Sequence, residues 1–193
     1  MGYPSLKLEE WYTYGDYLTW GDGERWELID GMAYNMSPAP TRRHQKMLGA
    51  LFGQFYHYLK DKPCDVYFAP FDVRLPEGGE ADEETATVVQ PDLVVVCDPD
   101  KLDDKGCRGA PDLVVEILSS STSGKDLKQK FNLYEQRGVR EYWIVDPSGG
   151  TIMVFRLGTD RRYGRPEVYT AEDTAPVGIF DDLVIDLRTV FAA

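Results

Sequence analysis

Cysteine and histidine are scarce in this sequence, and their spacing excludes several kinds of site. The 193 residues include three cysteines, Cys64, Cys97 and Cys107, and two histidines. The number of cysteines is odd, and their spacing matches no zinc or thiol-redox motif. Cys97 ends an apolar run, so we expect it to be a small core residue. The simplest interpretation is a protein of a reducing compartment, and we expect a cytoplasmic location.

The sequence also lacks any segment that would direct it to a membrane. No apolar run approaches the roughly 20 residues that a membrane-spanning helix needs. The first residues are acidic and aromatic, without the basic and then apolar regions of a signal peptide. Leu6 stands where N-myristoylation requires serine or threonine. We therefore expect no membrane association.

Basic residues are few relative to acidic ones. The chain has 21 lysines and arginines against 33 aspartates and glutamates, for a net charge of −12. Proteins that bind polyanions usually present a basic surface, so this balance counts against nucleic acid as a substrate. Two acidic clusters, 77–84 and 98–104, have the composition of solvated loops. Basic residues are denser at 42–46 and 125–140, so a polarised surface is compatible with the sequence.

The apolar content is sufficient for a substantial core. Apolar residues make up 42% and aromatic residues 12% of the chain, which excludes a disordered protein. The length predicts one domain spanning 1–193. Its core is expected at about 24–157, with N-terminal and C-terminal extensions packed on it.

Local patterns predict an α/β order of elements. The segments expected to form helices are 41–60, with apolar residues at three- and four-residue steps, and 125–137, which ends before Gly138. Those expected to form strands are 26–29 and 32–36 around an Asp-Gly turn, 66–75, 88–97, 113–118, 141–146, 151–156 and 183–187. The continuous β-branched runs in 88–97 and 113–118 indicate central strands that are covered on both faces.

Glu116 is anomalous because it lies inside the apolar run LVVEIL at 113–118. A carboxylate in such a strand costs several kcal/mol unless it is paired or bound to a metal. Glu116 is therefore one half of a buried ion pair, a residue at a strand end that reaches solvent, or a functional group.

Two aspartates begin the neighbouring apolar strands in the same Pro-Asp context. Asp92 follows Pro91, and Asp112 follows Pro111. An acid at the start of a strand is often only a turn residue, and one of the two is expected to have that role. Asp92, on the strand next to that of Glu116, is the candidate for a site.

Lys130 falls within the apolar stripe of its predicted helix, which Leu127, Phe131 and Tyr134 form. A lysine on an inward face needs a carboxylate partner, unless only its apolar stem is buried. Two acids and a lysine together predict a site for Mg²⁺ or Mn²⁺, because such ions bind carboxylate and phosphate oxygens. The lysine would hold a water or stabilise a pentavalent phosphorus.

The order of these motifs resembles the PD-(D/E)xK nuclease superfamily, which has the restriction-endonuclease-like fold. Roughly residues 10–160 resemble, more closely, the Uma-two family of restriction-endonuclease-like proteins. The matching segments and residues are WELIDGMAY (26–34), His44, QPDLVVV (90–96), APDLVVEILS (110–119), Asp126, Lys130, Tyr134 and GVREYWIVDP (138–147).

The resemblance implies a three-layer α/β/α fold with a central mixed sheet, to which we add an N-terminal hairpin and a C-terminal β extension. It also implies a Mg²⁺-dependent endonuclease that hydrolyses phosphodiester bonds in DNA. A homodimer is expected, because two sites are needed to cut two strands. Asp92 and Glu116 would hold the metal, and Lys130 would complete the catalytic set.

One position departs from the superfamily pattern. The superfamily places its lysine two residues after the second acid, where this chain has Leu118. Lys130, on the following helix, is the candidate replacement. If it does not replace that lysine, the chain is a nuclease-like binding module or regulatory subunit, which its net charge also favours. A metal hydrolase of a smaller phosphoester is a third alternative.

Four further residues are candidates for supporting roles. His44 lies on an apolar helix face, where a histidine is commonly a satisfied core residue, but in this family such a position can approach the metal. Glu27 can hydrogen-bond a metal-bound water or point to solvent. Gln90 precedes the first Pro-Asp pair and can position substrate or backbone. Tyr134 can orient the lysine or the glutamate through its hydroxyl, or only pack.

Overall fold

A computed structural model describes residues 10–21, 25–36, 39–119 and 124–192, except for the side chains of Lys125 and Asp126. Its helices are α1 (Tyr14–Tyr17), α2 (Arg42–Leu59), α3 (Gly124–Arg137) and α4 (Leu187–Phe191), with the 3₁₀ turns η1 (Asp82–Glu84) and η2 (Pro99–Lys101). None of the helices in these ranges is long and apolar enough to cross a membrane. The two long helices, α2 and α3, lie where the apolar periodicity predicted them.

The strands follow the predicted order but are more numerous. They are β1 (Trp26–Ile29), β2 (Met32–Asn35), β3 (Asp65–Phe68), β4 (Val73–Arg74), β5 (Val88–Val89), β6 (Leu93–Val96), β7 (Leu102–Asp103), β8 (Gly106–Arg108), β9 (Leu113–Ile117), β10 (Glu141–Asp146), β11 (Thr151–Arg156), β12 (Glu167–Thr170), β13 (Thr174–Pro176) and β14 (Val184–Asp186).

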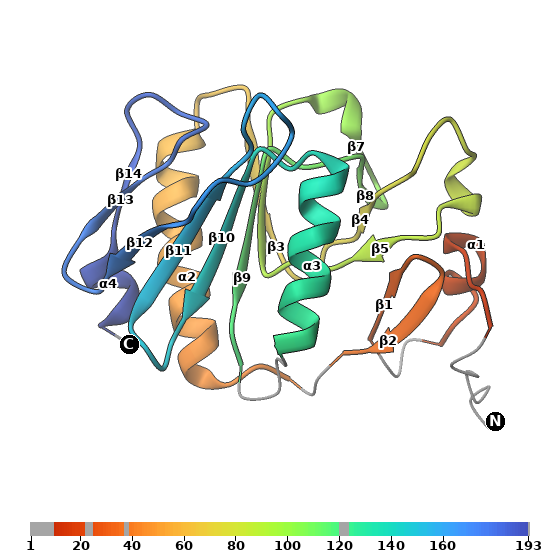
Figure 1. Cartoon of the computed structure of the whole chain (residues 1–193), viewed down its shortest axis with the longest axis horizontal. Coiled ribbons are helices and arrows are strands. Elements are labelled where there is room, and N and C mark those ends of the chain that lie inside the picture. Colours follow the sequence, from red (N-terminus) through yellow and green to blue (C-terminus); the bar gives the residue numbers. More distant parts are fainter. Residues whose placement is uncertain (1–9, 22–24, 37–38, 120–123, 193) are drawn as a thin grey trace.

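A six-stranded sheet in the order β12-β11-β10-β9-β6-β3 forms the centre of the molecule (Figure 1). β9 and β10 run parallel, and the other neighbouring pairs of this sheet are antiparallel. The sheet is therefore mixed, as predicted. α2 packs on one face and α3 on the other, which confirms the three-layer α/β/α arrangement.

Alternate residues of the central strands point into two separate cores, because side chains alternate across a strand. Val95 and Val115 pack with apolar residues of α2 and of the C-terminal extension. Their neighbours Val94 and Val114 pack with apolar residues of α3 and of a second sheet. Burial on both faces explains why these strands are continuously apolar.

Two strands that the sequence predicted as continuous are each divided between two sheets. β3 and β4 replace the strand expected at 66–75, and β5 and β6 replace the one expected at 88–97. β4 and β5 belong to a second six-stranded sheet of order β2-β1-β5-β4-β8-β7. Pro70 and Pro91 lie at the two breaks, and proline has no N–H to donate to a sheet ladder.

The N-terminal hairpin of β1 and β2 has the predicted Asp-Gly turn. Asp30 and Gly31 have φ angles of 48° and 72°, so both adopt the left-handed conformation of a type I′ turn. β1 also pairs with β5 through Leu28 and Val88. The hairpin is thereby fixed beside the segment that leads into β6.

The C-terminal extension is only partly strand. β12 extends the central sheet, whereas β13 and β14 form a separate pair. The strand predicted at 183–187 ends at Asp186, whose Oδ1 accepts a hydrogen bond from the backbone N of Arg188 at 3.1 Å and so caps α4. Leu187 and Val190 of α4 are fully buried in the core beside α2.

Cys97 is partly buried against the core, as predicted, but it also forms a disulfide with Cys64, which the sequence had not indicated. Cys64 precedes β3 and Cys97 follows β6. The register that pairs Asp65 with Val96 places the two cysteines opposite each other. Cys107 is free and buried.

The two acidic clusters are not only solvated loops, as their composition had indicated. The fully buried Arg74 donates from Nη1 to both carboxylate oxygens of Asp82, at 2.7 and 2.6 Å, and from Nη2 to Asp103 at 2.6 Å. One acid of each cluster therefore pairs with a fully buried arginine.

Candidate functional site

The strand register brings the two predicted acids together. β6 and β9 are antiparallel and pair Leu93 with Val115, so one position further along Asp92 lies opposite Glu116. Asp92 also fixes the end of β9, because its Oδ2 accepts a hydrogen bond from the backbone N of Ile117 at 2.7 Å. The two carboxylate side chains are 18% and 13% exposed, so both are largely shielded from water.

The second Pro-Asp aspartate lies at the other end of the same strand pair. Asp112 Oδ2 accepts a hydrogen bond from the backbone N of Cys97 at 2.8 Å. Its Oδ1 lies 3.1 Å from Nη1 of Arg140. Asp112 is therefore the aspartate with a structural role, and Asp92 is the one beside Glu116.

Lys130 reaches the site from α3 and joins two carboxylates. Its Nζ lies 2.9 Å from Oε1 of Glu116 and 2.9 Å from Oε1 of Glu27. Tyr134 donates its hydroxyl to the same Glu116 oxygen at 2.8 Å, and the backbone N of Gln90 donates to the same Glu27 oxygen at 2.9 Å. Lys130 thus has the carboxylate partners that an inward lysine requires, and its side chain is only 16% exposed.

The pKa values of Glu116 and Lys130 are both raised, for different physical reasons. Burial, reinforced by the charges of Asp92 and Glu27, raises the pKa of Glu116 to about 7, although Lys130 acts in the opposite direction. Burial by itself lowers the pKa of Lys130, but the two glutamates outweigh it and raise that pKa. The lysine is therefore charged, while Glu116 exchanges its proton near neutral pH.

His44 joins the site from the first turn of α2. Thr41 caps this helix, since its Oγ1 accepts a hydrogen bond from the backbone N of His44 at 3.2 Å. Nε2 of His44 lies 3.2 Å from Oδ1 of Asp92. Burial lowers the pKa of His44, but the hydrogen bond and the charge of Asp92 outweigh it and raise the pKa. His44 is therefore buried, as a core histidine would be, and its hydrogen-bond partner is the candidate site residue Asp92.

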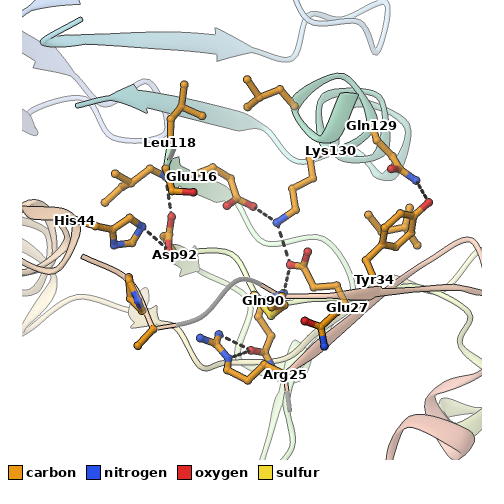
Figure 2. Close-up of a pocket in the computed structure, with 18 of the residues that line it drawn as sticks. Arg25, Glu27, Tyr34, His44, Gln90, Asp92, Glu116, Leu118, Gln129 and Lys130 are labelled. Atoms are coloured by element: carbon orange, nitrogen blue, oxygen red, sulfur yellow. Dashed lines mark hydrogen bonds and ion pairs between the residues drawn. The ribbon is translucent and has the colours of Figure 1, made fainter. Parts of the chain in front are cut away.

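These groups line one cavity of about 460 Å³, shown in Figure 2. Cavities of this size accommodate small molecules or single nucleotide units. The predicted residues that line it are Glu27, His44, Gln90, Asp92, Glu116 and Lys130. Tyr134 is not part of the lining and acts on the cavity through its hydrogen bond to Glu116.

Some residues of the cavity escaped the sequence analysis. Arg25, Glu27 and Ile29 are spaced two apart, so they lie on one side of the β1 segment, and all three line the cavity. That spacing was the signal that could have identified Arg25. Tyr34 and Gln129 also line the cavity, and Gln129 Nε2 donates to the Tyr34 hydroxyl at 2.9 Å. This contact joins α3 to the hairpin and has no local signal in the sequence.

Leu118 and Lys130 line the same cavity. Leu118 occupies the position where the superfamily has its lysine, and Lys130 reaches the same cavity from α3 and contacts Glu116 directly. The side chain of Asp126, another residue of the resemblance, lies outside the described part of the structure.

The acids are suited to a divalent cation as a pair. Within the described ranges, no group of three or more histidine, cysteine, aspartate or glutamate side chains is arranged to hold a metal ion. Mg²⁺ is commonly held by one or two carboxylates and keeps several waters. Glu116 uses Oε1 for Lys130 and Tyr134, and Oε2 accepts no hydrogen bond from the described side chains. That oxygen and the carboxylate of Asp92, whose oxygens also contact His44 and the backbone N of Ile117, are the groups that would hold such an ion.

Comparison with known proteins identifies the family of the chain. The model of the Uma2 family, described as "Putative restriction endonuclease", matches residues 13–188. The chain belongs to the Uma2 family. This confirms the resemblance drawn from the Pro-Asp, glutamate and helix-lysine motifs.

The chain is also similar to one cyanobacterial protein in sequence and to one solved structure in fold. The uncharacterized protein slr1290 of Synechocystis sp. (strain ATCC 27184 / PCC 6803 / Kazusa) is 27% identical over 161 residues, which cover 82% of this chain and 77% of that protein. The crystal structure of a "putative nuclease belonging to DUF820" from Anabaena variabilis ATCC 29413 is similar in fold, with a TM-score of 0.73 and 18% identity. That similarity covers 93% of this chain and 97% of the Anabaena chain, and it confirms the nuclease-like α/β fold.

Proposed function

We propose that this Uma2 protein is a divalent-metal-dependent endonuclease that hydrolyses phosphodiester bonds in DNA. The observation that carries the proposal is the antiparallel register that sets Asp92 opposite Glu116, with Lys130 hydrogen-bonded to Glu116. Two acids and a lysine in one cavity are the groups that metal-assisted phosphodiester hydrolysis requires.

Each group has a distinct part in this proposal. Asp92 and Glu116 would hold Mg²⁺ or Mn²⁺, which when bound activates a water and neutralises charge on the phosphate. Lys130 brings a positive charge that would stabilise the negative charge developing on the phosphate oxygens. Glu27 and Tyr134 are positioning residues, because they hold the lysine and Glu116 through the hydrogen bonds described above.

A second candidate function is a nuclease-like binding module without catalysis. The net charge of −12 favours it, because most of the surface would repel DNA. A hydrolase of smaller phosphoesters uses the same groups and differs only in substrate. Both alternatives are separated from the first by the assay below.

The experiment exploits the two aspartates that share the sequence context Pro-Asp-Leu-Val-Val. Supercoiled plasmid is incubated with Mg²⁺ or Mn²⁺ and with the parent protein, Asp92→Asn or Asp112→Asn. We expect the parent and Asp112→Asn to nick the plasmid, and Asp92→Asn to be slower by on the order of a hundredfold or more. Asp112→Asn should cost stability only, roughly 1–3 kcal/mol, so the assay is run below its unfolding temperature.

The other outcomes discriminate among the alternatives. Equal nicking by Asp92→Asn would mean a contaminant or a different site. A folded, DNA-free parent that never nicks would favour the binding module. Hydrolysis of nucleotides without cleavage of plasmid or single-stranded DNA would identify a smaller phosphoester as the substrate.

We also propose a cytoplasmic location. The disulfide between Cys64 and Cys97 makes this a testable point, because structural disulfides are uncommon in a reducing cytoplasm. Cell fractionation combined with alkylation of free thiols before lysis measures both properties at once. We expect the protein in the cytoplasmic fraction; its recovery outside that fraction would contradict the proposal.

A further inference from the structure

Arg25 lines the cavity and is held there by a neutral side chain. Its Nε and Nη2 atoms donate to Oε1 of Gln90 at 3.0 and 2.6 Å (Figure 2). Arg25 is exposed and forms no ion pair with an acid among the residues that the structure describes. Burial raises the pKa of Asp72 and the charge of Arg25, acting across Gln90, opposes that rise, but no acid among the described residues contacts the guanidinium directly.

The other cations of the cavity are already engaged. Lys130 contacts two glutamates, and His44 contacts Asp92. Among the described residues that line the cavity, Arg25 is therefore the cation without an acidic partner. An incoming anion would find its free positive charge there.

Gln90 holds the guanidinium in one orientation. Its Nε2 donates to the Tyr17 hydroxyl at 3.0 Å and to Oδ1 of Asp72 at 2.8 Å. Because both donors of the amide are used on that side, Oε1 must face Arg25. Gln90 is buried, with 8% of its surface exposed, so the amide that holds the exposed guanidinium is itself shielded from water.

The guanidinium keeps donors for a ligand. Nε and one N–H of Nη2 face Gln90, which leaves Nη1 and the second N–H of Nη2. A planar fork that is fixed in place and has no direct acidic partner among the described residues matches the oxygens of a phosphate. Because Gln90 is neutral, it orients the arginine and leaves its positive charge in place. A glutamate at position 90 would cancel that charge.

We propose that Arg25, oriented by Gln90, binds a backbone phosphate of a nucleic-acid strand that enters the cavity. This contact with the substrate adds detail to the proposed function. The identity of the ligand as a nucleic acid rests on that proposed function. Arg25 is a binding residue, and Gln90 is its positioning residue.

The test measures binding separately from cleavage. A short fluorescein-labelled single-stranded oligonucleotide is titrated with protein in Ca²⁺, without Mg²⁺ or Mn²⁺, and fluorescence anisotropy is recorded. Arg25→Met is compared with Arg165→Met, which removes the same charge from an exposed position outside the cavity lining. We expect Arg25→Met to weaken binding roughly ten- to a hundredfold and Arg165→Met to change it less than about twofold. The slope of log K against log salt should also fall by about 0.7 in Arg25→Met.

Two further variants test the positioning role of Gln90. Gln90→Glu retains Arg25 but sets a carboxylate against it, so affinity and salt slope should fall as they do in Arg25→Met. Arg25→Lys restores the charge without the fork and should recover only part of the affinity. Unfolding temperatures are measured for each variant so that a loss of binding is read on folded protein.

The outcomes are decisive in either direction. Equal affinities of Arg25→Met and Arg165→Met would overturn the inference, and so would a parent that does not bind the oligonucleotide. A parent that binds through Arg25 but never cleaves plasmid would contradict the proposed nuclease and support this inference. Cleavage with unchanged affinity in Arg25→Met would overturn this inference alone.

Discussion

At the scale of single residues, Lys130 keeps two buried carboxylates close to one another. Replacement of the lysine by methionine would leave Glu27 and Glu116 without their shared cation. Because unpaired buried charge is strongly unfavourable, we expect Lys130→Met to lower the free energy of unfolding by about 3–5 kcal/mol at pH 8. The loss should shrink near pH 5, where Glu116, whose pKa is raised to about 7, takes up a proton. Urea denaturation at both pH values measures it.

Lys128→Met is the matched control, because Lys128 lies on the same helix and is exposed. We expect it to change the stability by less than about 0.5 kcal/mol. A similar small loss in Lys130→Met, or a loss that does not depend on pH, would mean that the two glutamates are not stabilised by the lysine.

The raised pKa of Glu116 makes a second prediction at this scale. Its pKa of about 7 in the folded protein lies above the ordinary value of 4.5, so the folded state binds this proton more tightly than the unfolded state. Stability should therefore fall as the pH rises from about 4.5 to about 7, and this group contributes no slope outside that window. Comparison of unfolding free energies of the parent and Glu116→Gln isolates the effect, because the variant lacks the titration. A parent and variant with parallel pH profiles would contradict it.

A cation bound at Glu116 competes with that proton. Mg²⁺ or Mn²⁺ should raise the unfolding temperature of the parent more at pH 8 than at pH 5, because the carboxylate is ionised only at the higher pH. Glu116→Gln should lose this stabilisation at both pH values. Equal stabilisation at pH 5 and pH 8 would place the cation elsewhere on the protein.

At the scale of elements, the disulfide ties the edge strand β3 to β6. Cys64 and Cys97 are separated by 33 residues, and closing a loop of that length stabilises a folded chain by roughly 3–4 kcal/mol in the chain-entropy model. Urea denaturation with and without a phosphine reductant should show a loss of that order. The reductant should not affect a variant with serine at both positions. An unchanged midpoint in the parent would contradict a contribution of the disulfide to stability.

The candidate site takes its side chains from several separate elements. β6 supplies the position of Asp92, β9 supplies Glu116, α3 supplies Lys130, and β1 supplies Glu27. The contacts between these elements bring Lys130 within hydrogen-bonding distance of both glutamates, and the strand register sets Asp92 opposite Glu116. A rigid sheet edge with a helix over it is therefore the support of the candidate site.

At the scale of the whole molecule, the candidate site built around Asp92 and Glu116 occurs once in the described part of the chain. Cleavage of both DNA strands requires two such sites, so we expect a homodimer. Sedimentation equilibrium should give twice the mass of the chain. Below the dimer dissociation constant, the rate of plasmid linearisation should rise with the square of the protein concentration. A monomer in sedimentation that linearises plasmid at a rate proportional to its concentration would contradict the prediction.

The sequence by itself determined the features that depend on local order. Apolar periodicity predicted α2 and α3, the Asp-Gly pair predicted the hairpin turn, and an acid and a lysine among apolar neighbours identified Glu116 and Lys130. These predictions succeed because periodicity and turn chemistry act over a few residues. The same motifs carried the family resemblance.

Only the tertiary structure decided which of two identical local contexts belongs to the site. Asp92 and Asp112 both stand in Pro-Asp-Leu-Val-Val, yet antiparallel pairing of β6 and β9 sends them to opposite ends of the strands. The Cys64–Cys97 disulfide and the place of Arg25 beside Gln90 likewise depend on partners 33 and 65 residues away. Strand register is set by the packing of whole elements, and no short window of sequence contains it.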